Sequence, residues 1–271
     1  MDTQFDTIKV AVQDSVLHVT LNRPEARNAM SLQMVLELQT LLNQVASKHD
    51  IRVIVMRGAN GHFCAGGDIK DMANARAQLS QGGNPYFDLN RQFGHLITQA
   101  NQCPQLLITL LEGAVLGGGF GLACVSDVAI TRNDAQFGLP ETSLGVIPAQ
   151  IAPFVVQRIG LTQARRLALL GLRIDGNEAV KLGIAHTVAN NNDELETQLA
   201  NLLNQAKKCA PQANRLTKAL LHRVGNEPLS TLLDDAARQF AGAVIGDEAQ
   251  EGTLAFVQKR QPRWAQQEEL P

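Results

Sequence analysis

The sequence predicts an α/β fold in which parallel strands alternate with helices, followed by a mainly helical C-terminal region. Up to about residue 131, short apolar runs alternate with helical patterns and glycine turns, as buried strands joined by helices do. From about residue 149 the pattern is mainly helical. Apolar residues make up 45% of the 271 residues and charged residues 18%, which supplies enough material for a large core.

The first elements are a hairpin and a helix. Residues 8–12 and 16–21 have the composition of two short strands around Gln13-Asp14-Ser15, which is typical of a hairpin. Asn22-Arg23-Pro24 breaks the second strand. Ser31 is then the expected N-cap of a helix of about 17 residues. The apolar residues expected on its buried face are Leu32, Val35, Leu36, Leu42 and Val45.

Three apolar runs are typical of buried parallel strands: 51–57, 106–111 and 128–131. A glycine-rich loop over 58–68 follows the first run. After the second, glycines between 112 and 121 lead into a helix that extends through Val125. The segment 72–105 gives a weaker pattern. It holds Gly82-Gly83-Asn84-Pro85 and then a helix expected to end before Pro104.

The C-terminal region reads as helices. The expected helices are 193–209, 211–224, 228–242 and 247–260. We place the boundary at Asn190-Asn191-Asn192, so that 1–192 forms the α/β core and 193–271 the helical region. Apolar residues of the tail are expected to pack on this core or on a neighbouring subunit. They are Leu232, Leu233, Ala236, Phe240 and Val244.

Composition argues against several classes of protein. The net charge of −2 and the 4% of aromatic residues do not favour a nucleic-acid binder. The four cysteines are widely spaced and are expected to be reduced thiols. We see no signal peptide, no membrane span and no metal-ligand spacing. These features predict a cytoplasmic protein without a metal.

Two glycine turns each follow a buried strand: 63–68 and 116–120. Glycine lets a backbone turn sharply and present bare N–H groups, and a helix N-terminus leaves further N–H groups unpaired. Two such turns side by side would form an oxyanion hole. The glycines alone also fit two plain tight turns, and Gly117-Gly118-Gly119-Phe120-Gly121 is a poor match to a dinucleotide-binding fingerprint.

Longer stretches make the resemblance specific. FCAGGDIKDM (63–72), EGAVLGGGFGLACVSDVAI (112–130) and AQFGLPETSLGVIP (135–148) resemble the crotonase superfamily, the enoyl-CoA hydratases and isomerases. NRPEARNAMS (22–31) and EGTLAFVQKRQPRW (251–264) resemble it as well, so the likeness spans nearly the whole chain. It implies the crotonase spiral of ββα-type repeats with C-terminal helices, an acyl-CoA substrate without a separate cofactor, and a homotrimer or a dimer of trimers.

The resemblance also implies roles for residues. The backbone N–H groups of Ala65 and Gly118 match the donors to the thioester oxygen. The positions implied to contact coenzyme A are Arg23, Ala26, Arg27, Ala65, Gly66, Gly67, Asp68, Gly118, Phe256 and Lys259. The two arginines equally fit solvated surface residues, and the last two positions equally fit a core phenylalanine and an exposed lysine.

The acid/base residues depart from the pattern of the family. Hydratases of the family commonly use two glutamates. The first position is Gly121 here, and the second matches Glu141. One carboxylate suits an isomerase that moves a proton between two carbons. It also suits a hydratase whose water is held by other groups. Tyr86, Asp88 and His95 are more typical of surface or packing residues than of replacements.

A finer likeness concerns the substrate. GGGFGLACVSDVAI (117–130) and PAQIAPFVVQRIGL (148–161) are similar to a branch near the isohexenylglutaconyl-CoA hydratases, which also carry the glycine. Their branched acyl chain bears a second carboxylate, which would hold the water. Hydration of a 2-enoyl-CoA with Glu141 as acid/base is therefore the first hypothesis, and isomerisation by Glu141 alone is the second. A non-catalytic CoA- or RNA-binding protein is a third.

Overall fold

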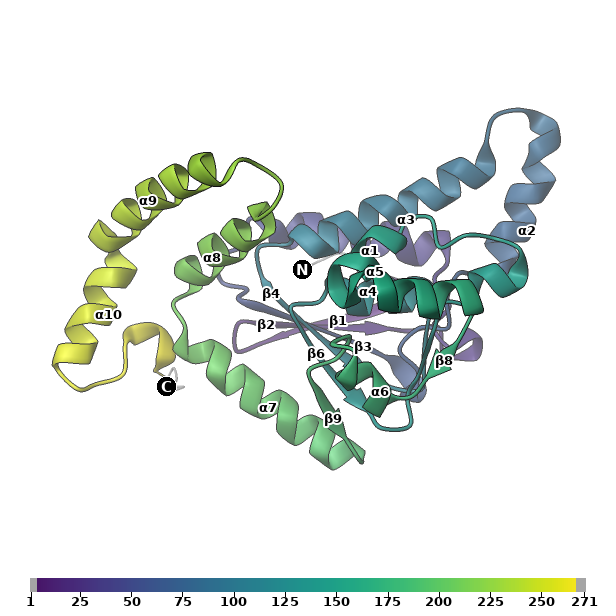
Figure 1. Ribbon diagram of the computed structural model, residues 1–271. Helices are drawn as coiled ribbons and strands as arrows, with labels where there is room; N and C mark the ends of the chain where they lie inside the picture. Colours follow the sequence, from purple (N-terminus) through teal and green to yellow (C-terminus); the bar gives the residue numbers. More distant parts are fainter. Residues whose placement is uncertain (1–3, 267–271) are drawn as a thin grey trace. The chain divides into compact units, whose positions relative to one another are not determined.

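The computed structural model describes residues 4–266, which group into two compact units (Figure 1). The first unit comprises the described residues up to Cys103 together with Leu107–Gln198. The second comprises Pro104–Leu106 and the described residues from Leu199 on. The division falls within helix α7 (Asn192–Lys208). Each unit is considered by itself below.

The larger sheet has six strands in the order β1-β2-β3-β4-β6-β9. Their bounds are β1 (Ile8–Gln13), β2 (Val16–Leu21), β3 (Val53–Gly58), β4 (Leu106–Leu111), β6 (Val128–Arg132) and β9 (Thr187–Ala189). β1 and β2 are antiparallel, and the pairs β2–β3, β4–β6 and β6–β9 are parallel. The predicted hairpin and the predicted parallel strands are therefore confirmed. Positive φ angles at Asp14 and Ser15 make the hairpin turn, as such tight turns require.

A second sheet has three short strands, in the order β5-β7-β8. They are β5 (Ala114–Leu116), β7 (Gln136–Gly138) and β8 (Arg173–Ile174). Runs of two or three residues carry too little periodicity to be predicted. β5 matters for the site because it ends directly before Gly117. The Gly117 N–H in turn donates to the carbonyl of Gly138, the last residue of β7, at 3.1 Å.

The helices of the first unit cover the sheets. They are α1 (Leu32–Ala46), α2 (Ile69–Gln78), α3 (Pro85–Gln102), α4 (Gly118–Val125), α5 (Ala152–Leu170) and α6 (Gly176–Lys181). Ser31 is confirmed as the N-cap of α1, since its hydroxyl accepts from the Met34 N–H at 3.2 Å. The buried face of α1 includes Met34 and Leu38. The expectation for Leu36 is wrong, because its side chain is 44% exposed.

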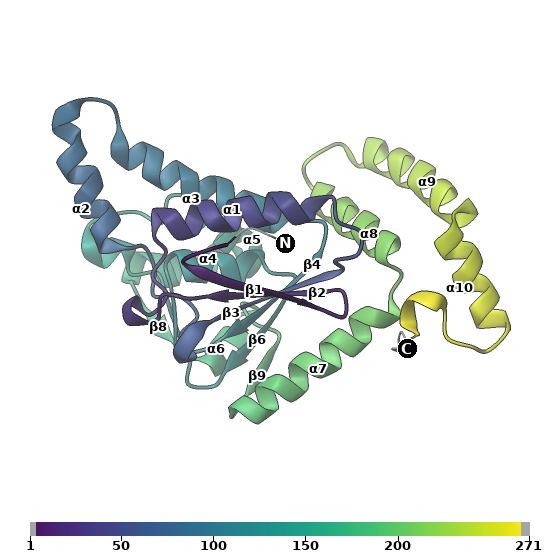
Figure 2. The same ribbon diagram turned by 180° about the vertical axis from the view of Figure 1, so that it is seen from behind.

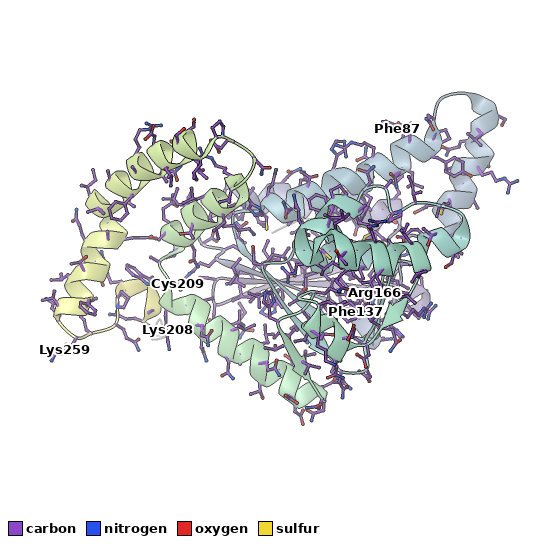
Figure 3. The ribbon with its side chains drawn as sticks, in the orientation of Figure 1. Phe87, Phe137, Arg166, Lys208, Cys209 and Lys259 are labelled. Carbon is purple, nitrogen blue, oxygen red and sulfur yellow. The ribbon has the colours of Figure 1, made fainter. Side chains whose placement is uncertain are left out.

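Helices α1 and α3 lie side by side along one face of the larger sheet (Figures 1 and 2). α2 and the first part of α3 extend beyond the sheets as an arm. Figure 3 shows Phe87 on the outer part of α3. α3 confirms the helix predicted before Pro104, but α2 was not predicted. Helix α2 buries Ala75 and little else. A helix with so small a buried face needs little apolar periodicity in its sequence, so the pattern does not predict it.

The core beneath the site contains three fully buried aromatic rings, Phe63, Phe120 and Phe137. The rings of Phe120 and Phe137 meet edge to face with centroids 6.2 Å apart, a favourable arrangement for aromatic pairs. Figure 3 shows Phe137 within the first unit. This contact joins α4 to β7, so the helix that starts at the second glycine turn is anchored to the smaller sheet.

The second unit is helical, as predicted. Its helices after α7 are α8 (Pro211–Arg223), α9 (Leu229–Ile245) and α10 (Asp247–Val257). On α9, Leu232 is buried, whereas Leu233, Phe240 and Val244 are at least half exposed. Among residues 4–266, no helix is long and apolar enough to cross a membrane. The same residues hold no group of three or more His, Cys, Asp or Glu side chains placed to bind a metal ion.

Candidate active site

The two glycine turns lie side by side in the structure. An isolated parallel bridge pairs Cys64 with Val115, so the first turn runs along β5. At its end, a Cβ atom added to Gly117 would lie 3.5 Å from the Gly66 Cα. Both glycines have positive φ, 103° at Gly66 and 50° at Gly117, a region that side chains disfavour. The glycines therefore allow two backbones to approach closely at one point.

The oxyanion donor predicted at Ala65 needs correction. The Ala65 N–H donates to the Arg27 carbonyl at 3.1 Å, so this donor is already used by the backbone. A parallel bridge pairs Met30 with Gly67, with hydrogen bonds through Gly66 O and the Asp68 N–H. In such a bridge the N–H of Gly67 points away from Met30. Across residues 4–266, no hydrogen bond occupies the Gly67 N–H.

The second predicted donor, Gly118, is the first residue of α4. The first N–H groups of a helix have no intrahelical acceptor, and the helix dipole adds partial positive charge there. No acceptor for the Gly118 N–H is found in the described part of the chain. Phe93 of α3 covers this residue, since its Cζ lies 3.1 Å from the position of a Cβ on Gly118. Gly67 and Gly118 thus present two uncommitted N–H groups on adjoining turns.

Glu141 points its carboxyl at the second turn. It begins a short 3-10 helix (Glu141–Leu144), and its Oε1 lies 3.0 Å from the position of a Cβ on Gly117. Its Oε2 is inaccessible to solvent and has no hydrogen-bond partner within residues 4–266. Burial raises the pKa of Glu141, and its own backbone N–H lowers it only in part. A buried carboxyl with a raised pKa can both accept and return a proton.

The position of the missing glutamate is closed by packing. Gly121 is buried in α4. A Cβ at this position would lie 2.4 Å from Ile151 Cγ2 and 2.9 Å from Ile97 Cδ1. These distances are shorter than any van der Waals contact. The isoleucines therefore occupy the space that a second carboxylate would need, and Gly121 is a packing requirement of this chain.

Arg23 and Asp68, both predicted to contact coenzyme A, are paired with each other. Arg23 Nη2 lies 2.6 Å from Asp68 Oδ2, and the two side chains are only 17% and 7% exposed. Arg23 Nη1 also donates to the Ala29 carbonyl at 2.6 Å. Asp68 caps α2 by accepting from the Lys70 N–H at 2.7 Å. Arg23 is therefore engaged in holding the first turn, and this pairing disfavours its predicted role toward phosphate.

The Asp68 pKa reflects these partners. Burial alone would raise the pKa of Asp68, but the hydrogen bond from the Lys70 N–H and the charged Arg23 guanidinium outweigh burial and lower it. The carboxylate is thus held in its charged form.

Arg27 is the better-placed arginine for phosphate. It has left-handed φ/ψ of 49° and 41° at the end of the 3-10 turn Pro24–Ala26, and its side chain is exposed. Ala26 is half-buried in the same turn. Phe256, 85% exposed, and the exposed Lys259 lie in the second unit at the end of α10. Figure 3 shows Lys259 at the tip of this helix.

Several residues around the turns were not predicted. Phe93 and Ile97 are four residues apart on α3, so they share one helix face and reach Gly118 and Gly121. Ile151 precedes α5 and packs from the other side. Apolar residues at helical spacing form the same pattern whether they line a site or a core, so no signal in the sequence separates the two.

Comparison with known proteins now places the chain in a family. The sequence model of the family described as enoyl-CoA hydratase/isomerase matches residues 11–267. The chain therefore belongs to the enoyl-CoA hydratase/isomerase family.

Individual relatives carry both activities in their names. The chain is 30% identical to the peroxisomal Delta(3,5)-Delta(2,4)-dienoyl-CoA isomerase of Arabidopsis thaliana over 96% of each chain. It is 29% identical to the enoyl-CoA hydratase AKT6-1 of Alternaria alternata, over 99% of this chain and 87% of that protein. The solved structure of Pseudomonas aeruginosa AtuE matches with a TM-score of 0.94 and 61% identity, over 96% of this chain and 100% of that one. The predicted crotonase fold is confirmed.

Replacing Gly121 by alanine is expected to destabilise the protein. The new methyl group meets Ile151 and Ile97, and overpacking of this kind costs about 1–3 kcal/mol. The matched control is Gly242→Ala in α9, where the new Cβ meets nothing within 4 Å and helix propensity favours alanine by about 1 kcal/mol. Urea denaturation measures both. Equal stability of Gly121→Ala and the native chain would contradict the packing argument.

Replacing Asp68 by asparagine is expected to leave Arg23 without its charge partner. Breaking a buried pair lowers the unfolding free energy by about 3 kcal/mol. Because the folded-state pKa of Asp68 is lowered, the stabilisation exists above the unfolded pKa and is lost as pH falls through the folded pKa. The difference between native and variant chains should therefore shrink in acid.

The control for this variant is Asp134→Asn, whose carboxylate is 67% exposed and pairs with Arg132. An exposed pair is expected to contribute less than about 1 kcal/mol. Unfolding by urea near neutral pH and in acid compares the two. A loss at Asp68 no larger than at Asp134, or independent of pH, would refute the role of the Arg23–Asp68 pair.

Proposed function

We propose that this member of the family hydrates the double bond of a 2-enoyl-CoA, with Glu141 as the acid/base residue. The observation that carries the proposal is the Glu141 carboxyl. One of its oxygens faces the Gly117 turn, and the other is buried without a hydrogen-bond partner among the described residues. A buried carboxyl oxygen without a partner is costly, and a reacting substrate or water would satisfy it.

The N–H groups of Gly67 and Gly118 supply the second part of the proposal. A thioester carbonyl between the two turns would accept both hydrogen bonds. When a nucleophile adds at C3 of the enoyl chain, negative charge develops on this carbonyl oxygen. Preorganised donors lower the barrier because the charge is largest in the transition state. We therefore assign to Gly67 the role that the family resemblance implied for Ala65.

In the proposed reaction, Glu141 acts twice. As a carboxylate it takes a proton from water while the water oxygen bonds to C3, and the electron pair of the double bond moves toward the thioester oxygen. The resulting enolate is held by the two N–H groups. Glu141 then returns the proton to C2, which regenerates the carboxylate. Atoms balance: one water is added across one double bond.

Isomerisation of the double bond is the second candidate, and the closed space at Gly121 favours it. Glu141 would take a proton from one carbon and return it to another, so no water needs to be positioned. Hydration without a second glutamate needs another group to hold the water. A second carboxylate on a branched, glutaconyl-type acyl chain would serve, as in the isohexenylglutaconyl-CoA or methylglutaconyl-CoA substrates that the likeness implies.

Coenzyme A contacts and assembly complete the proposal. Ala26 and Arg27 lie next to the first glycine turn, because the Arg27 carbonyl accepts from the Ala65 N–H. We propose that these two residues and the 65–68 turn bind the coenzyme A portion. Phe256 and Lys259 would reach it in an assembled trimer or dimer of trimers. The exposed apolar side chains on α9, including Phe240 at 72% exposure, support a subunit interface. We expect neither a nucleic-acid nor a membrane partner.

Glu141→Gln is expected to lower turnover by at least about 100-fold, because general acid/base catalysis contributes about 10²–10⁴-fold. The matched control is Glu112→Gln, which replaces another half-buried glutamate whose pKa burial raises. Mass spectrometry after reaction of crotonyl-CoA, 3-methylglutaconyl-CoA and 3-hexenoyl-CoA in H₂¹⁸O measures the products. A labelled 3-hydroxyacyl product identifies a hydratase, and an unlabelled shifted double bond identifies an isomerase. Full activity of Glu141→Gln would contradict either assignment.

The pH dependence of kcat/KM should report Glu141. The residue must be ionised to take a proton, and burial raises its pKa above the ordinary value of 4.5. Activity should therefore fall, as the pH is lowered, at a pH above that value. The Glu112→Gln control should keep this acid limb, and any residual activity of Glu141→Gln should lack it. A profile that stays flat down to the ordinary glutamate range would show that Glu141 is not the base.

A further inference from the structure

A polar cluster on α3 lies next to the apolar contacts of the site. Asn90, Phe93, Gly94 and Ile97 follow the i, i+3, i+4, i+7 spacing, so they share one face of the helix. Phe93 reaches Gly118, and Ile97 reaches Gly121. The two remaining positions are Asn90, which is polar, and Gly94, which has no side chain. They face Gln150, the residue directly before Ile151.

Arg91 and Gln150 occupy the space beside Gly94. A Cβ on Gly94 would lie 2.0 Å from Gln150 Oε1 and 2.4 Å from Arg91 Nη1. Arg91 Nη1 donates to Gln150 Oε1 at 3.0 Å, and Gln150 Nε2 donates to Asn90 Oδ1 at 2.8 Å. A side chain at position 94 would displace the ends of both of these side chains. Arg91 is an exposed residue, and its guanidinium lies against the buried Gly94 of α3, three residues before Ile97.

The charge of Arg91 is not neutralised by another side chain. Its hydrogen-bond partner is the neutral Gln150 amide, and no carboxylate of residues 4–266 pairs with it. Arg23, Arg57, Arg166 and Arg223 pair with carboxylates. Arg158, like Arg91, donates to neutral acceptors, which are the backbone carbonyls of Ser126, Gly183 and Ile184. A guanidinium offers five N–H donors in a planar fork that matches a carboxylate. Gln150 uses one of them, so a bidentate face remains available.

The order of contacts gives the cluster a place relative to the substrate. Arg27 contacts the first glycine turn, where its carbonyl accepts from the Ala65 N–H, and this is the part of the site proposed for coenzyme A. Phe93 contacts the second turn at Gly118, and Gly94 follows it directly on the same helix. An acyl chain whose thioester lies at Gly67 and Gly118 would extend past Glu141 toward α3.

We propose that Arg91, held by Gln150 beside Gly94, is a specificity-determining residue that binds a second carboxylate on the acyl chain of the substrate. This inference rests on the proposed function, because it assumes an acyl-CoA with its thioester at the glycine turns. It adds the residue that selects a negatively charged chain over a neutral one. A carboxylate has about four acceptor sites, so it can accept from Arg91 and still orient a water near C3.

Binding of unreactive ligands tests the inference apart from catalysis. Glutaryl-CoA carries a terminal carboxylate and no double bond, and its terminal amide is an uncharged ligand of the same shape. Calorimetry should show tighter binding of glutaryl-CoA to the native chain. Arg91→Gln should weaken that binding by about 10- to 100-fold, as expected for loss of a hydrogen-bonded charge. Binding of the amide should change by less than about twofold.

Two further variants sharpen the test. Arg91→Lys should restore part of the preference, because it keeps the charge but loses the fork. Arg165→Gln, an exposed arginine fourteen residues beyond Ile151, should leave both ligands unaffected. Equal affinity of the native chain for the two ligands, or equal weakening of both by Arg91→Gln, would overturn the inference. Turnover of glutaconyl-CoA by the native chain tests the proposed function separately, since these binding constants do not depend on Glu141.

Discussion

The close approach of the Gly66 and Gly117 backbones is the constraint on which the rest of the site depends. The Cys64–Val115 bridge brings the two chain segments together. Two residues after the bridge, each segment has a glycine with a positive φ, Gly66 in one and Gly117 in the other. A side chain on Gly117 would meet Glu141 Oε1 and would be strained at the positive φ of this residue. Without that approach, the N–H groups of Gly67 and Gly118 would not adjoin each other, and Glu141 would face a side chain in place of bare backbone.

Polar contacts hold the first turn in position. Asn28, fully buried, accepts from the Arg23 N–H and donates to the carbonyls of Ala59 and His62. Arg23 then pairs with Asp68 beneath the turn. Each of these groups is satisfied, so the network adds rigidity without leaving a buried charge unpaired. A rigid donor loop is what electrostatic preorganisation requires.

Much of the fold could be predicted from the sequence, because the spacing of apolar residues in long segments differs between helices and strands. The hairpin, the buried strands, α3 and the four C-terminal helices all follow from apolar patterns. β5 and α2 could not be predicted, since one has three residues and the other buries little apolar surface. The likeness to the family pointed to the two glycine turns, which the structure places side by side, and to Glu141, whose role stays a proposal.

The contacts that decide the chemistry of the site cannot be predicted from periodic patterns or from the family likeness. Whether Ala65 or Gly67 offers its N–H depends on which one pairs with Arg27 across a loop, and no local pattern encodes that pairing. Likewise, the sequence shows that Gly121 lacks a carboxylate, but not that Ile151 and Ile97 fill the space. Arg91 is exposed, and its hydrogen bond to Gln150, fifty-nine positions away, places it beside Gly94, a pairing that no local pattern encodes.

In the proposed site, hydration and isomerisation share a first requirement, an enolate oxygen held by the N–H groups of Gly67 and Gly118 with Glu141 beside it. They differ in what approaches the other face of the acyl chain. At Gly121 that face is apolar, so the chain itself provides no second carboxylate to hold a water. Any polar group acting there must come from the substrate or from α3. If the two proposals hold, the apolar packing at Gly121 and the charge of Arg91 would act together: a neutral enoyl chain would find no protein carboxylate to position water, whereas a carboxylated chain would bring its own.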